Sequence, residues 1–142
     1  MSPHRIPLDT GVTAPRPGAC TRIHLSAAGV SAVLDVTDGR TPALAHWGAA
    51  LGPLGEDGLD TLCETAIDVV PQNAVDVPVH LGLIPQQADG WIGRPGLSGS
   101  RPDGSGWAPR LVTRAVTVDG EPVTGERRET GAALARFDLA DE

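Results

Sequence analysis

The density of glycine and proline is the feature that most constrains the fold of this chain. There are 18 glycines and 13 prolines among 142 residues, about twice the usual share of these two residue types. They follow no repeat, and enough Val, Leu, Ile and Ala separates them to exclude a wholly disordered chain. An interior proline costs a helix about 3 kcal/mol and a glycine about 1 kcal/mol. The sequence therefore predicts an all-β fold of short strands joined by tight turns.

Five Asp-Gly dipeptides are candidate turns, because Asp-Gly suits the two left-handed positions of a type I′ hairpin. They are Asp38-Gly39, Asp57-Gly58, Asp89-Gly90, Asp103-Gly104 and Asp119-Gly120. Apolar and alternating segments predict strands at residues 30–36, 43–47, 77–83, 111–118 and 131–139. Pro78 favours an edge or a bulge for the third of these. Apolar residues at helical spacing predict one helix of one or two turns over residues 59–66.

The domain organisation follows from the same residues. Four prolines (Pro3, Pro7, Pro15 and Pro17) predict an irregular lead over residues 1–21. Residues 22–142 are expected to form an antiparallel β-sandwich. The last predicted strand ends only three residues before Glu142, a pattern typical of a truncated domain. We therefore expect an incomplete sandwich.

Charge and composition exclude several classes of partner. Acidic residues outnumber basic ones by 18 to 11, for a formal net charge of −7, which disfavours nucleic acid. All the basic residues are arginine, which argues against a polybasic membrane tail, and no apolar run could span a bilayer or serve as a signal peptide. Two distant cysteines, Cys20 and Cys63, cannot form a metal knuckle or a redox CxxC. A cytoplasmic protein with no metal and no cofactor is the expectation.

Few side chains of the sequence suggest a catalytic, metal-binding or ligand-binding role. The four histidines have no metal spacing. His24 and His80 lie in apparent strands, where a hydrogen-bonded structural role is expected. No carboxylate pair or serine–histidine–acid set stands out. Trp91 lies in a glycine-rich loop, where it would either plug the end of the sandwich or present its face to a sugar ring. Arg94 could donate hydrogen bonds to sugar hydroxyls beside it. Trp47 follows an alternating strand and is expected in the core, while Trp107 fits either role.

Two stretches, residues 33–48 and 90–99, together with the linking residues 78–81 and 84–85, resemble glycoside hydrolase family 36. These are the α-galactosidases in their actinobacterial form, and the likeness covers about residues 22–140. The resemblance implies the first part of an N-terminal β-supersandwich that precedes a (β/α)₈ barrel with two catalytic Asp. The barrel is absent from this chain, so the chain alone is predicted to be inactive and no catalytic residue is assigned. Where many members have an acidic residue ahead of a Phe-Arg pair, this chain has Trp91, Ile92 and Gly93, with Arg94 beside Pro95. Trp91 and Arg94 are therefore the expected substrate-binding residues.

The activity that the resemblance implies is hydrolysis of terminal α-D-galactosides with retention, by carboxylates about 5–5.5 Å apart in the missing barrel. The sequence leaves two other functions open. The first alternative is a non-catalytic carbohydrate-binding β-sandwich. The second is a structural or oligomerisation module, whose partner would be another copy of the chain.

Overall fold

A computed structural model describes residues 20–70, 72–73, 78–123, 127–131 and 134–142. The elements are β1 (Cys20–Ala27), β2 (Val30–Thr37), β3 (Ala43–Ala49), α1 (Gly55–Thr65), the 3₁₀ turn η1 (Gln87–Asp89), β4 (Leu111–Val118), β5 (Glu121–Pro122), β6 (Arg127–Gly131) and β7 (Ala135–Asp141). Strands dominate, which confirms the predicted all-β class. The sandwich they form is not closed.

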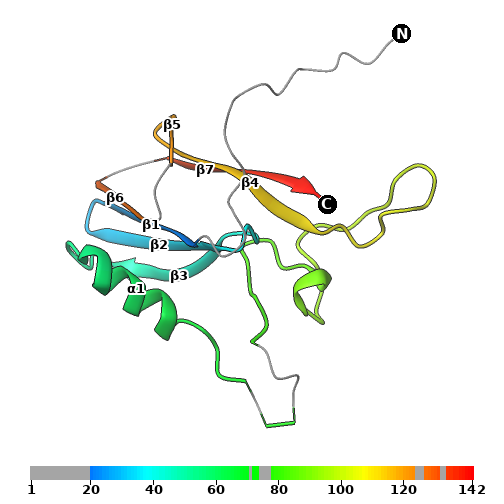
Figure 1. Cartoon of the computed structure of the whole chain (residues 1–142), viewed down its shortest axis with the longest axis horizontal. Helices are drawn as coiled ribbons and strands as arrows, with labels where there is room; N and C mark the ends of the chain where they lie inside the picture. The colour runs from blue at the N-terminus through cyan, green and yellow to red at the C-terminus, as the bar shows by residue number, and fades with distance from the viewer. Residues whose placement is uncertain (1–19, 71, 74–77, 124–126, 132–133) are drawn as a thin grey trace.

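The strands make two sheets (Figure 1). The four-stranded sheet has the order β3-β2-β1-β6, and the three-stranded sheet has the order β5-β4-β7. Every pair is antiparallel except β1 and β6, which run parallel with His24 opposite Glu129. This parallel pair was not predicted, because it joins residues about a hundred positions apart.

The main core lies between the two sheets. Ile23 and Leu34 of the four-stranded sheet pack against Val116 and Val118 of β4. Phe137 of β7 contacts the same cluster. Burial of each such side chain contributes about 1.5–3 kcal/mol, so this cluster holds the two sheets together.

A second core lies on the opposite face of the four-stranded sheet, where α1 packs (Figure 1). Leu59 and Cys63 of the helix contact Val33 of β2. The helix has 11 residues, so it is longer than the one or two turns expected. It begins at Gly55 and contains Asp57-Gly58, so the predicted turn at that dipeptide is wrong. The apolar stripe buried against Val33 outweighs the poor helix propensity of the glycines.

Two of the predicted Asp-Gly turns have the type I′ backbone, with positive φ at both residues. Asp119-Gly120 joins β4 to β5, and Asp38-Gly39 follows β2. Asp89-Gly90 and Asp103-Gly104 are turns within loops, with positive φ at the glycine only. The hairpin between β1 and β2 uses Ala28-Gly29, which the sequence analysis missed because alanine rarely takes φ near +48°.

Three predicted segments differ from the structure. The strand expected over residues 77–83 is absent from its described part, residues 78–83, where Gly82 makes one isolated bridge to Ala43; Val77 lies outside the described residues. The strand expected over residues 131–139 is replaced by β6, which ends at Gly131, and β7, which begins at Ala135. β6 consists mostly of polar residues that precede the strand expected over residues 131–139. β1 begins at Cys20, within the lead predicted over residues 1–21, of which residues 1–19 lie outside the described part.

Part of the four-stranded sheet's inner face is uncovered. Leu44 and Trp47 of β3 pair with Leu34 and Ala32, so they point to the side on which Leu34 meets the other sheet. Leu44 is nevertheless 42% exposed and Trp47 73% exposed. The expectation that Trp47 lies in the core is therefore wrong, because the three-stranded sheet does not extend over β3. Within the described residues, no helix has both the length and the apolar character needed to cross a membrane.

Candidate functional site

The turn after β2 docks against β4, and this junction builds the candidate site. The buried Thr113 donates its backbone N–H to the carbonyl of Gly39 (2.6 Å) and its hydroxyl to the carbonyl of Arg40 (2.7 Å). The β4–β7 register shifts between Thr113 and Ala115, and Arg114 is exposed at this irregularity. The side chains of Arg40 and Arg114 therefore start from two segments locked together by hydrogen bonds.

A polar hollow of about 550 Å³ lies at this junction, within the size range of small-molecule sites. Its walls come from the turn after β2, the η1 segment, the start of β4 and the last residue. The lining residues are Asp38, Gly39, Arg40, Gln86, Asp89, Arg110, Leu111, Val112, Thr113, Arg114 and Glu142. The walls thus combine guanidinium, carboxylate and amide groups.

Gln86 holds one wall in place. Its side-chain amide donates to the carbonyl of Leu111 (2.9 Å) and accepts from the N–H of Leu111 (2.8 Å), as a paired strand would. The same Nε2 donates to Asp89 Oδ2 (2.7 Å). Because Gln86 is buried and its polar groups are satisfied, the η1 segment is fixed to the beginning of β4.

A small apolar notch of about 10 Å³, with no room for a ligand inside it, adjoins the hollow and shares Gln86 and Leu111 with it. Pro95, Leu97 and Trp107 line the notch. Trp107 is 72% exposed, so the sandwich core does not account for its ring. An exposed indole beside polar planar groups can hold the apolar face of a ring-shaped polar ligand.

A second hollow, of about 450 Å³, also borders the turn after β2. Asp38 and Arg40 line both hollows. The second one also includes Asp35, Thr37 and Cys63, with residues 66–68 and 78–81 closing it. Its chemistry therefore depends on the polar groups of β2 and α1.

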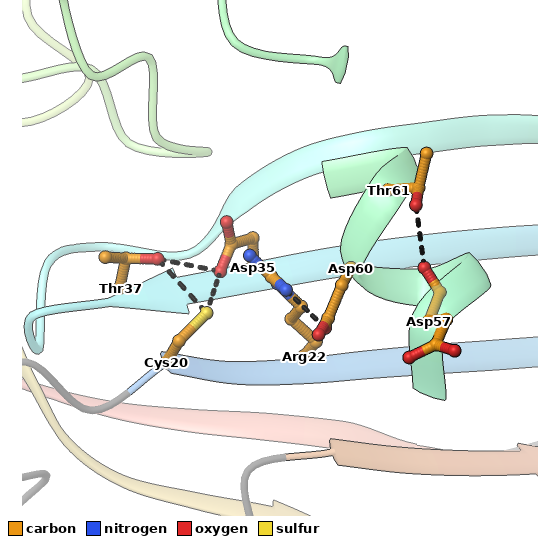
Figure 2. A network of polar contacts seen from close by, with 7 residues as sticks. All are labelled: Cys20, Arg22, Asp35, Thr37, Asp57, Asp60 and Thr61. Carbon is orange, nitrogen blue, oxygen red and sulfur yellow. Dashed lines mark hydrogen bonds and ion pairs between the residues drawn. The ribbon is translucent and has the colours of Figure 1, made fainter. Parts of the chain in front are cut away.

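Those polar groups form a network that Figure 2 shows. The carboxylate of Asp35 accepts from the Cys20 thiol (3.2 Å) and from the Thr37 hydroxyl (2.9 Å). Arg22 of β1 pairs with Asp60 of α1 and ties the helix to the sheet. With its Oδ1 held by two donors, Asp35 serves mainly to order the ends of β1 and β2.

The two thiols are not activated. Burial raises the pKa of the Cys63 thiol to about 12, with the Asp35 charge adding to the effect. Burial likewise raises the pKa of Cys20. Since the thiolate is the nucleophilic form, neither cysteine is suited to covalent chemistry. Both are free.

The structure brings together one serine–histidine–acid set, which the sequence analysis did not find. Buried His24 lies 2.9 Å from Ser31 Oγ through Nε2 and 2.7 Å from Glu129 Oε1 through Nδ1. Ser31 is fully buried, and its oxygen also accepts from the Leu51 N–H (3.2 Å). A substrate cannot reach Ser31, so the set has a structural role. No sequence signal joins Glu129 to His24, because their contact depends on the parallel β1–β6 pair.

Trp91 and Arg94, the predicted sugar-binding residues, lie together in one loop. The indole Nε1 of Trp91 donates to the backbone carbonyl of Arg94 (3.0 Å), and the ring packs over Gly93 so closely that a Cβ there would lie 2.7 Å from it. Neither residue lines the two larger hollows. Pro95 and Leu97, which follow in the loop, do line the notch beside Trp107.

The other histidine placed in a predicted strand is His80, which lies outside the strands of the structure. Its Nε2 is 2.7 Å from the carbonyl of Thr41, so it fastens residues 78–81 to the chain after β2. Among the described residues, no group of three or more His, Cys, Asp or Glu side chains is arranged to hold a metal ion.

The site residues that the sequence analysis missed are Arg40 and Arg114, whereas Trp107 was left open between a core and a ligand-facing role. The Asp38-Gly39 turn was predicted, so Arg40 could be placed beside a turn, but nothing in the sequence indicates that this turn docks on β4. Comparison with known proteins adds no family: no family model, curated protein or solved structure matches the chain.

Proposed function

We propose that this chain is a sugar-binding β-sandwich with no catalytic activity of its own, and that it holds a terminal α-galactoside in the polar hollow between the turn after β2 and β4. The observation that carries the proposal is the meeting of two surfaces. One is a hollow of about 550 Å³ lined by guanidinium, carboxylate and amide groups. The other is the exposed ring of Trp107 in the adjoining notch.

A pyranose ring needs both surfaces. Its hydroxyls donate and accept hydrogen bonds at fixed spacings, which suit the planar groups of Arg, Asp and Gln. Its C–H face is apolar and packs on an aromatic ring. Gln86 is already bonded on both sides to Leu111, so it shapes the wall, and the arginines and carboxylates supply the contacts.

The resemblance to glycoside hydrolase family 36 extends this proposal to a larger protein. The chain would be the first part of the N-terminal domain of a retaining α-galactosidase, whose catalytic Asp pair lies in a barrel beyond this chain. The uncovered sheet face at Leu44 and Trp47 supports this, because a larger β-domain would bury it. In that enzyme, Trp91 and Arg94 would add a second contact to the sugar. Both cysteines are free thiols, which fits the proposed location in the cytoplasm.

Titration calorimetry with methyl α-D-galactoside tests the binding function. We expect saturable binding, and Trp107→Ala should weaken it by about tenfold or more, the scale of one lost aromatic face. Trp47→Ala is the matched control, since Trp47 is equally exposed but lies on β3, away from the hollow. It should leave the affinity unchanged.

The same preparation should release no product from a chromogenic α-galactoside. Binding that survives Trp107→Ala but is lost in Trp47→Ala would place the ligand on the sheet face and contradict the proposal. Turnover abolished by a substitution within this chain would contradict the absence of catalysis.

A further inference from the structure

The formal charges that line the polar hollow balance each other. The lining includes three arginines and three carboxylates: Arg40, Arg110, Arg114, Asp38, Asp89 and Glu142. A hollow with no net charge selects neither an anion nor a cation through its overall field. Selectivity then depends on hydrogen bonds to single groups, and above all on a group that is held in a fixed position.

Asp89 is such a group. Its Oδ2 accepts from Nε2 of Gln86 (2.7 Å), and its backbone N–H donates to the carbonyl of the same residue (3.1 Å). Gln86 is only 5% exposed and is itself bonded on both sides to Leu111 of β4. The side chain of Asp89 is therefore tied to a buried anchor, and a contact that is ordered before binding loses less entropy when the ligand arrives.

The bond from Gln86 leaves much of the acceptor capacity of Asp89 unused. An ionised carboxylate has two oxygens with about four lone-pair sites, and a neutral amide donor leaves its negative charge in place. Among the described residues, none donates to Oδ1 of Asp89. Glu142, by contrast, pairs with Arg110 (3.3 Å), and both of those side chains are exposed. Oδ1 of Asp89 is thus a fixed, charged acceptor in the lining of the hollow.

We propose that Asp89 is the specificity-determining residue of this hollow: its Oδ1 accepts a hydrogen bond from one hydroxyl of the sugar, and Gln86 is the positioning residue that keeps it oriented. The ligand class is then a neutral sugar with a free hydroxyl at the recognised carbon. A carboxylate at that carbon would be repelled by Asp89, and a deoxy carbon has no proton to donate. The inference rests on the proposed function, because it names what the same site requires of its ligand.

Calorimetry with methyl α-D-galactoside and its 2-, 3-, 4- and 6-deoxy analogues tests the inference. In the native chain, at least one analogue should bind about tenfold or more weakly than the parent sugar, the scale of a hydrogen bond to a charged group. Asp89→Asn should weaken binding of the parent by a similar factor. An asparagine that keeps its oxygen on Gln86 turns its NH₂ group, which cannot accept, toward the ligand. In this variant the same analogue should bind as well as the parent.

Asp138→Asn is the matched control. Asp138 of β7 is half-buried like Asp89 and also accepts through one oxygen, from Arg136 (2.9 Å), but it lies outside the hollow. The substitution removes the same charge and should change no sugar affinity. Thermal melts of both variants show whether the fold is intact.

Gln86→Glu is a second variant, which tests the same contact from its other side. A glutamate can still accept from the Leu111 N–H, but it has no donor for Asp89. The positioning role predicts that the affinity ratio between the parent sugar and the sensitive analogue falls toward one. A merely structural role would weaken both sugars by the same factor and leave that ratio unchanged, which would overturn the assignment of Gln86.

The outcomes separate this inference from the proposed function. Galactoside binding that Asp89→Asn leaves unchanged overturns the inference and leaves the proposed function standing. The same holds if the native chain and Asp89→Asn discriminate equally between the parent sugar and every analogue. Absence of galactoside binding to the native chain overturns both.

Discussion

Glu129 of β6 accepts a hydrogen bond from the backbone N–H of Leu54 at 2.9 Å, so an edge strand caps helix α1. Leu54 is the N-cap residue and has no polar side chain with which to cap the helix itself. The same carboxylate oxygen lies 2.7 Å from Nδ1 of His24, a side chain that is only 2% exposed. One acidic residue thus links β6, β1 and α1, and its charge complements the positive end of the helix dipole.

Glu129→Ala should lower the free energy of unfolding by about 2 kcal/mol. About 1 kcal/mol corresponds to a lost helix cap, and about 1 kcal/mol or more to the buried His24 left without its partner. Urea unfolding followed by circular dichroism measures the loss. Glu64→Ala, at an exposed position near the end of α1, is the control and should change stability by less than about 0.5 kcal/mol. Equal stability of the two variants would contradict the linking role of Glu129.

The same contact predicts a pH dependence. The Leu54 N–H, followed by the bond from His24, holds the pKa of Glu129 below its ordinary value of 4.5. A depressed carboxyl pKa stabilises the fold fully above the ordinary value, and the stabilisation is lost as pH falls through the lower, folded-state value. The difference in melting temperature between the native chain and Glu129→Gln should therefore be constant between about pH 6 and 7 and shrink below about pH 4.5. A difference that stays constant down to pH 3 would contradict this.

The thiol of Cys63 should be inert in the folded chain. It is buried between Leu59 and Val33, and burial raises its pKa to about 12. At pH 8 almost no thiolate forms, so reaction with a chromogenic disulfide reagent should be slower than for the unfolded chain by about two orders of magnitude or more. Cys20→Ser isolates the signal of Cys63. Native-state reaction at the rate seen in urea would show that α1 does not stay packed on the sheet.

Trp47 should promote association of the isolated chain. With Leu44 and Val30 it leaves an apolar area of the four-stranded sheet open to solvent. Trp47→Ser should therefore reduce both aggregation and the fluorescence of an apolar dye, with a stability change of less than about 1 kcal/mol because the ring is mostly exposed. Light scattering, dye binding and a thermal melt on both proteins decide this. A large fall in the melting temperature of Trp47→Ser would show that Trp47 contributes to the core, and would contradict this prediction.

Trp91 bears on the contact implied by the family resemblance. Its indole closes the loop onto Arg94, and the same loop carries Pro95 and Leu97 into the notch. In the full-length enzyme, where Trp91 would contact the sugar, Trp91→Ala should weaken galactoside binding by about 1–3 kcal/mol, the scale of one large apolar face, and should affect folding less. Calorimetry and a melting curve on this variant check both quantities. Unchanged affinity with a much lower melting temperature would make Trp91 a purely structural residue.

Local patterns predicted much of this fold. The strand at residues 111–118 and the turn at Asp119-Gly120 follow from alternation and from a dipeptide suited to left-handed backbone, and both appear in the structure. Contacts between residues far apart in the sequence could not be predicted from these local patterns. β6 is a polar segment that forms a strand only because β1 lies beside it, and the exposure of Trp47 depends on how far the other sheet reaches.

The candidate site was harder to predict than the fold. Arg40 and Arg114 are separated by more than seventy residues, and their backbones lie close together only because Thr113 donates to the carbonyls of Gly39 and Arg40. Neither arginine lies in a motif of its own. The sequence did not decide whether Trp107 lies in the core or on the surface. Its 72% exposure depends on the path of the surrounding loop, which the sequence does not predict.

Backbone NMR of the ¹⁵N-labelled chain, titrated with methyl α-D-galactoside, tests the central claim most directly. If the hollow binds sugar, the largest shifts will fall on residues 38–40, on Thr113 and Arg114, and on the indole N–H of Trp107, while the indole N–H of Trp47 stays unchanged. Shifts confined to β3 and Trp47, or no shifts at millimolar sugar, would contradict the claim that this hollow is a sugar site.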